Sequence, residues 1–123
     1  MKLGIRGHLV EVAASVKELV SQRMWFALGR YQEQIEEVMV RLSDENGPKG
    51  GRDKVCRVVV SIASRRLFVS EVAPDLPAAI SRAAERIGRA VSRELERIRV
   101  FRQQEKAASA RQRPRRFMRE EQP

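Results

Sequence analysis

Hydrophobic and polar positions follow two different periods along the chain, and these periods divide it into helices and strands. In residues 81–99, apolar side chains recur every three or four positions, as in an α-helix with one buried face. Strand-like alternation with a period of two occupies residues 36–43, 55–62 and 65–71. A short first strand is predicted at residues 2–7, followed by a helix that ends near Tyr31.

The predicted order is β-α-β-β-β-α, which indicates an α+β fold. We expect a two-layer sandwich, in which two helices pack on one face of a four-stranded sheet. Residues 1–102 would form this domain, and residues 103–123 a basic, disordered tail. The strand positions expected to face the helices are Val38, Val40, Leu42, Cys56, Val58, Val60, Ile62, Leu67 and Val69.

Local signals place the starts and ends of the two helices. Ser15 and Glu18 have the spacing of a capping box, and Asp75 is suited to cap the second helix, with Pro77 in its first turn. That second helix is expected to end near Arg102, and Pro114 is expected to stop any helix in the segment after it. The inner face of the first helix is predicted to carry Val16, Val20, Ala27 and Tyr31. That of the second is predicted to carry Ile80, Ala84, Ile87, Val91, Leu95 and Ile98.

The second helix carries a line of arginines, which we call the arginine stripe: Arg82, Arg86, Arg89, Arg93 and Arg97. At helical spacing these five residues fall within an arc of about 80°, roughly opposite the apolar face. Glu85, Glu94 and Glu96 flank the line without entering it. A merely solvated face would mix the two signs of charge, so the stripe favours an anion-binding surface.

The charge balance indicates which anion. The chain has 25 Lys+Arg against 16 Asp+Glu, a net charge of +9, and 20 of the 25 basic residues are arginine. Residues 1–51 are neutral overall, so the whole surplus lies in residues 52–123. Arginine contacts phosphate through a planar fork and stacks on bases, and this profile is typical of a nucleic-acid-binding protein. A membrane surface would require a free apolar face, which the core is expected to occupy.

Other kinds of site find little support. Cys56, the only cysteine, lies in phase with buried strand positions and is predicted to be a core thiol in a reducing cytoplasm. No second Cys or His accompanies Cys56 and His8, so neither a metal site, a cofactor nor an enzyme is predicted. The glycine-rich segment 44–54 leads into a strand, which favours a hairpin loop over a phosphate-binding loop. No signal peptide or membrane span is evident.

Two segments resemble the ribosome hibernation promoting factors, also called sigma-54 modulation proteins. The opening "MKLGIRGHLVEV" and "DLPAAISRAAERIGRAVSRELERIR" carry the likeness, which covers about residues 1–99. Arg86, Arg89 and Arg93, interleaved with Ile87 and Val91, fall where family members carry basic and apolar residues. Residues 100–123 are too few for the second domain of long members, which indicates the short form.

The resemblance implies a cytoplasmic protein, monomeric off the ribosome, that inhibits translation during stress. Such proteins lodge in the messenger and transfer RNA channel of the small ribosomal subunit and contact ribosomal RNA. By position, the RNA-binding residues would be Arg86, Arg89 and Arg93 with Arg23 and Arg30 of the first helix. Arg82 and Arg97 extend the stripe.

Alternatives remain open from the residues alone. The order of elements also resembles the double-stranded RNA-binding fold, so a generic nucleic-acid-binding module is the main alternative. A partner protein with an acidic surface is a third. Trp25 is expected to be a partly buried anchor rather than a base-stacking platform. For His8 we expect a structural or RNA-contacting role in a turn, and for the basic run 111–116 either a solubilising end or an arm that orders on RNA.

Overall fold

The computed structural model describes residues 1–8, 10–44 and 54–121, with side chains through residue 110. Its elements, in chain order, are β1 (Lys2–His8), α1 (Ala14–Leu28), the 3-10 helix η1 (Gly29–Tyr31), β2 (Ile35–Asp44), β3 (Lys54–Ile62), β4 (Arg65–Ala73) and α2 (Leu76–Glu121). Two compact units, Met1–Val91 and Ser92–Pro123, divide the chain within α2. Each unit is described by itself.

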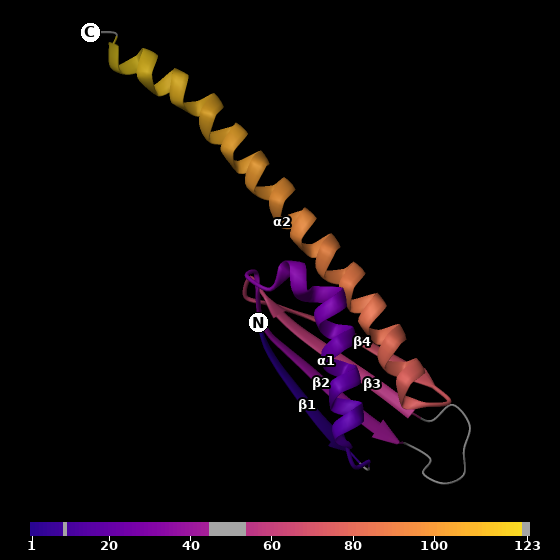
Figure 1. Cartoon of the computed structure of the whole chain (residues 1–123). Coiled ribbons are helices and arrows are strands. Elements are labelled where there is room, and N and C mark those ends of the chain that lie inside the picture. The colour runs from indigo at the N-terminus through magenta and orange to yellow at the C-terminus, as the bar shows by residue number, and fades with distance from the viewer. Residues whose placement is uncertain (9, 45–53, 122–123) are drawn as a thin grey trace. The chain divides into compact units, whose positions relative to one another are not determined.

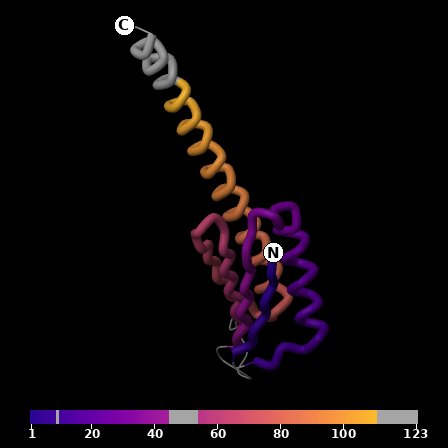
Figure 2. The backbone as a smooth tube through the Cα atoms, turned by 90° about the vertical axis from the view of Figure 1, so that its left-hand side faces the viewer, coloured from indigo at the N-terminus to yellow at the C-terminus, as the bar shows by residue number. Residues whose placement is uncertain are grey.

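The first unit has the predicted β-α-β-β-β-α order (Figure 1). Its four strands form one sheet in the order β1-β2-β3-β4. β1 runs parallel to β2, whereas β2 with β3 and β3 with β4 are antiparallel, so the sheet is mixed. The helices cover one face of the sheet, and Figure 2 shows α1 as a layer beside the strands. The expected two-layer fold is therefore confirmed.

The core lies between this sheet face and the helices. Val38, Val40 and Leu42 of β2 are fully buried, and so are Cys56, Val58 and Val60 of β3, as their alternation predicts. α2 contributes Ala79, Ile80, Ala83, Ala84, Ile87 and Val91. Leu67, on the edge strand β4, is only half-buried, while Val69 is buried. In the second unit Leu95 and Ile98 are half-exposed.

The inner face of α1 differs from the prediction. Its buried residues are Val20, Met24 and Leu28, whereas Ala27 is half-buried. These three positions recur every four residues and place one stripe over the sheet. Tyr31 was expected to continue the face, but it belongs to the 3-10 helix η1 and is only half-buried.

The two predicted caps have opposite outcomes. The backbone N–H of Ala78 donates to Oδ1 of Asp75 over 2.8 Å, which confirms Asp75 as the cap of α2. The capping box at Ser15 is wrong, because α1 begins at Ala14 and its N-cap residue Ala13 makes no side-chain hydrogen bond. Ser15 therefore lies inside the first turn.

α2 also continues past the end expected near Arg102, since its backbone is helical through Glu121. This segment contains the strong helix formers Ala107, Ala108 and Ala110, and it also includes Pro114, which had been expected to stop any helix. Mobility of residues 103–123 in solution stays a prediction.

Candidate nucleic-acid interface

Three residues of the arginine stripe lie in the first unit, exposed on α2, and each contacts a neighbouring group. Arg82 Nη1 reaches the carbonyl oxygen of Val72 at 3.4 Å. Arg86 Nη1 donates to the carbonyl oxygen of Ser70 at 3.1 Å and to a Glu71 carboxylate oxygen at 2.9 Å. Two arginines are thereby attached to β4, and their guanidinium groups stay accessible to solvent.

Arg89 forms an i,i+4 ion pair with Glu85 along the surface of α2. Both side chains are more than half exposed, so water screens the pair and its contribution to stability is small. An anion that approaches Arg89 has only this weak partner to displace.

The other two stripe residues belong to the second unit. Arg97 donates to both carboxylate oxygens of Glu94, at 2.6 and 3.3 Å, and this hydrogen bonding raises the pKa of the Arg97 guanidinium. Arg99 pairs with Glu96 in the same way, which lowers the pKa of the Glu96 carboxyl. Among the described residues, Arg93 has no ion-pair partner, and its side chain is exposed.

The glutamates therefore do more than flank the stripe. Glu85 and Glu94 pair with stripe arginines, and Glu71 adds a third carboxylate from the sheet. The sequence predicted an uncompensated row of cations, but helical spacing of three or four residues brings each acid within reach of a guanidinium. All five arginines nonetheless remain exposed.

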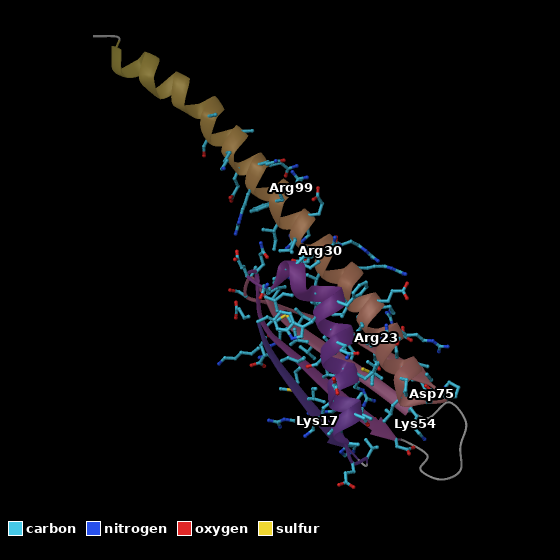
Figure 3. All side chains as sticks on the ribbon, in the orientation of Figure 1. Lys17, Arg23, Arg30, Lys54, Asp75 and Arg99 are labelled. Atoms are coloured by element: carbon cyan, nitrogen blue, oxygen red, sulfur yellow. The ribbon has the colours of Figure 1, made fainter. Side chains whose placement is uncertain are left out.

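The two predicted residues of the first helical segment are also exposed. Arg23 lies midway along α1, and Arg30 lies in η1 just past its end (Figure 3). The Arg30 guanidinium stands 4.9 Å from the centre of the Tyr31 ring, in cation–π contact. Trp25 is 43% exposed, as expected of a partly buried anchor, whereas Phe26 is 92% exposed.

The sequence interpretation missed a second group of basic residues, on the sheet face away from the helices. Arg6 of β1, Arg41 of β2 and Arg57 of β3 are register partners in one row across three strands. His8, expected in a turn, ends β1 and faces Ser43. The alternation along β2 predicts that Arg41 points away from the helices. It does not predict the strand register that aligns the three arginines.

The described part of the chain offers little support for a metal site, a membrane span or a reactive cysteine. There, no group of three or more His, Cys, Asp or Glu side chains is placed to hold a metal ion, and no helix is long and apolar enough to cross a membrane. Burial, helped by the nearby Glu71 charge, raises the pKa of the Cys56 thiol to about 12. This thiol is therefore a poor nucleophile at neutral pH. Most of the glycine-rich loop, residues 45–53, lies outside the described residues.

Comparison with known families decides the classification. The profile described as "Sigma 54 modulation protein / S30EA ribosomal protein" matches residues 3–99. The chain belongs to this family. Sigma 54 modulation/S30EA proteins are non-catalytic ribosome-binding hibernation factors, so both the resemblance and the non-enzymatic prediction are confirmed. A search of curated proteins finds no match.

Solved structures support the same fold. The N-terminal domain of Protein Y from Thermus thermophilus is 26% identical, with a TM-score of 0.63 over 76% of this chain and 98% of that one. A ribosomal subunit interface protein from Coxiella burnetii is 12% identical, with a TM-score of 0.66 over 78% of this chain and 99% of that one. The second likeness concerns the fold alone.

Proposed function

We propose that this S30EA-family protein silences ribosomes by occupying the messenger and transfer RNA channel of the small subunit. The observation that carries the proposal is the family match over residues 3–99, which contain all seven predicted RNA-binding arginines in exposed positions. Within the first unit, Arg23, Arg30, Arg82, Arg86 and Arg89 all belong to the helical layer. This layer is the surface that we place against ribosomal RNA.

The contacts of these arginines suit phosphate binding. A guanidinium has five N–H donors, and the pairs with Glu85 and Glu94 engage only part of that capacity. Phosphate oxygens accept the remaining donors in bidentate geometry and, being charged, compete well with the exposed carboxylate of Glu85. Such contacts give affinity and orientation without reading base sequence.

The primary experiment is co-sedimentation with small subunits and whole ribosomes, together with a cell-free translation reaction. We expect the protein to migrate with the small subunit and to inhibit translation. Excess double-stranded RNA in the binding reaction should compete poorly. Normal translation without ribosome association would overturn the proposal, and strong competition by the duplex would favour a generic double-stranded RNA-binding module.

A matched pair of triple variants tests the arginine stripe. Changing Arg86, Arg89 and Arg93 to Gln should weaken ribosome binding and lower the salt slope by somewhat less than one per lost phosphate contact. The control changes Arg65, Arg99 and Arg102, which are exposed cations outside the stripe and outside the C-terminal segment, to Gln. Equal affinities for the two variants, with intact circular dichroism, would show that the stripe only solvates the helix.

The basic C-terminal segment contributes through phosphates in this proposal. A chain ending at Gln103 should bind ribosomes less tightly than the full chain, and the difference should be larger at low salt. Equal affinities at two salt concentrations would leave residues 104–123 as a solubilising end.

A further inference from the structure

The sheet face that points away from the helices carries a second set of charged and aromatic groups. We infer that this open face binds single-stranded RNA. The inference goes beyond the proposed function, which places only the helical layer on ribosomal RNA.

The strand register builds two adjacent rows on the open face. The basic row consists of Arg6, Arg41 and Arg57, on β1, β2 and β3. The apolar row, two residues along each strand, consists of Met39, Val59 and Phe68, on β2, β3 and β4. Side chains two residues apart on a strand share a face, so both rows point to the same side of the sheet.

The burial pattern confirms which side this is. Val38, Val40, Val58 and Val60 alternate with these residues and are fully buried against the helices. Arg6 and Arg41 are exposed, Met39 and Val59 are half-buried, and Phe68 is 60% exposed. The open face is thus accessible along both rows.

Met39 makes part of this surface flat and apolar. A Cβ added at Gly4, its register partner on β1, would lie 2.8 Å from Met39 Cε and 3.1 Å from its sulfur. The Met39 side chain therefore lies over the backbone of β1 instead of standing off the sheet. Any larger side chain at position 4 would displace it.

The charge on this face points to an anion. Arg6 and Arg41 stand directly opposite each other on neighbouring strands, where like charges repel and destabilise the pairing. Lys2 and Arg66 add two exposed cations at the far side of the apolar row, with Glu37 as the acid between them. Arg57 is half-buried and already has an interaction within the protein, so Arg6 and Arg41 are the phosphate-binding pair.

Phe68 decides between single-stranded and duplex RNA. β4 lies two strands from β2, or about 10 Å, so a base on Phe68 leaves its backbone within reach of Arg41. Aromatic side chains on a sheet stack on unpaired bases. In a duplex the bases are stacked inside the helix, so a protein side chain reaches only the grooves and the backbone. An aromatic ring beside a pair of arginines therefore fits an unpaired strand.

The arrangement gives the first unit two basic surfaces on opposite sides of one sheet. A protein of this kind can hold two RNA segments at once, one against each layer. The surfaces are separable by substitution, because no residue belongs to both.

The test uses the full chain, labelled with ¹⁵N, and an eight-nucleotide oligouridylate RNA. We expect amide shifts on β1, β2 and β4 to follow the titration. The Arg6→Gln/Arg41→Gln variant should reduce the salt slope of binding by about 1.4, the value for two contacts to a single strand. The Phe68→Ala variant should weaken binding by at least about fivefold, the lower end of the effect of losing a stacked base.

Two control variants make the same kinds of change in the second unit. Arg99→Gln/Arg102→Gln removes two exposed cations, and Phe101→Ala removes a phenylalanine that is 55% exposed. Both should bind the oligonucleotide as the unchanged chain does. Shifts confined to α1 and α2, or equal losses in the control and sheet variants, would overturn the inference.

Ribosome binding separates this inference from the proposed function. The Arg86, Arg89 and Arg93 triple variant should keep oligonucleotide binding even where it loses ribosomes, and a chain that failed to bind ribosomes would leave the oligonucleotide result standing. If the sheet variants lost ribosome binding while the unchanged chain ignored the oligonucleotide, the open face would dock on an acidic protein, and the RNA inference would be wrong.

Discussion

Arg86 on α2 and Glu71 on β4 form an ion pair of 2.9 Å that joins the helical layer to the edge of the sheet. The same guanidinium nitrogen also donates to the carbonyl oxygen of Ser70. A central member of the proposed RNA-binding stripe is therefore also a structural contact. Substituting it changes stability and binding together, so a binding assay alone would misjudge its role.

Comparing Arg86 with Arg89 separates these two effects. Arg86→Gln should lower the free energy of unfolding by about 0.5–1 kcal/mol, since it removes a partly exposed ion pair and a hydrogen bond. Arg89→Gln should leave that free energy nearly unchanged, because its pair with Glu85 is exposed. Both should weaken ribosome binding. Urea unfolding checks the first expectation, and equal stability of the two variants would contradict it.

Gly88 marks the close approach of α2 to α1. A Cβ added there would lie 3.4 Å from both the Cβ and the carbonyl oxygen of Ala27, which is ordinary contact. Gly88→Ala should therefore raise the free energy of unfolding by about 0.5–1 kcal/mol through helix propensity. Gly88→Leu should lower it by about 1–3 kcal/mol, because the longer side chain overpacks the contact. Thermal unfolding followed by circular dichroism measures both, and loss of stability in the alanine variant would show that the helices are closer still.

The turn between β3 and β4 is built from unfavourable residues. Ala63 and Ser64 have φ angles of 49° and 64°, in the left-handed region that two-residue hairpins require and that Asn and Gly adopt readily. The double change Ala63→Asn/Ser64→Gly should raise the free energy of unfolding by about 1–2 kcal/mol. Differential scanning calorimetry would detect it. An unchanged midpoint of thermal unfolding would indicate that residues 63 and 64 do not adopt left-handed conformations in this turn.

The free energy of unfolding should decrease at high pH because of Cys56. Its thiol has a pKa of about 12 in the folded chain against 9.0 for an unperturbed thiol, so the unfolded state loses the proton first. The thiol's contribution to stability is complete below pH 9 and is lost as the pH rises from 9 towards 12. Urea midpoints measured across that range should fall more steeply than those of a Cys56→Ala variant. Parallel curves would contradict the burial of the thiol.

Local signals were enough for some features and failed for others. Asp75 was predictable as a cap because the cap and its donor Ala78 are three residues apart. Val38, Val40 and Leu42 were predictable because alternation reports directly which side of a strand is covered. Met24 was missed, although it follows Val20 by four residues and therefore lies on the same side of α1.

The least predictable feature was the alignment of Arg6 with Arg41. The two lie far apart in sequence, and only the register of β1 on β2 brings them together. The ion pair between Arg86 and Glu71 has the same origin, since it depends on where α2 crosses β4. Both contacts come from tertiary placement, which no local pattern encodes.

The parallel pairing of β1 with β2 also bears on how the chain folds during synthesis. A parallel pair needs a crossover, here α1, whereas β2, β3 and β4 follow one another in antiparallel pairs. β1 leaves the ribosomal exit tunnel before its partner exists, and its edge-strand hydrogen-bonding groups stay open until β2 has followed. Of the four strands, β1 thus cannot pair until the crossover and β2 have emerged, and during that interval its open hydrogen-bonding groups can associate with other chains.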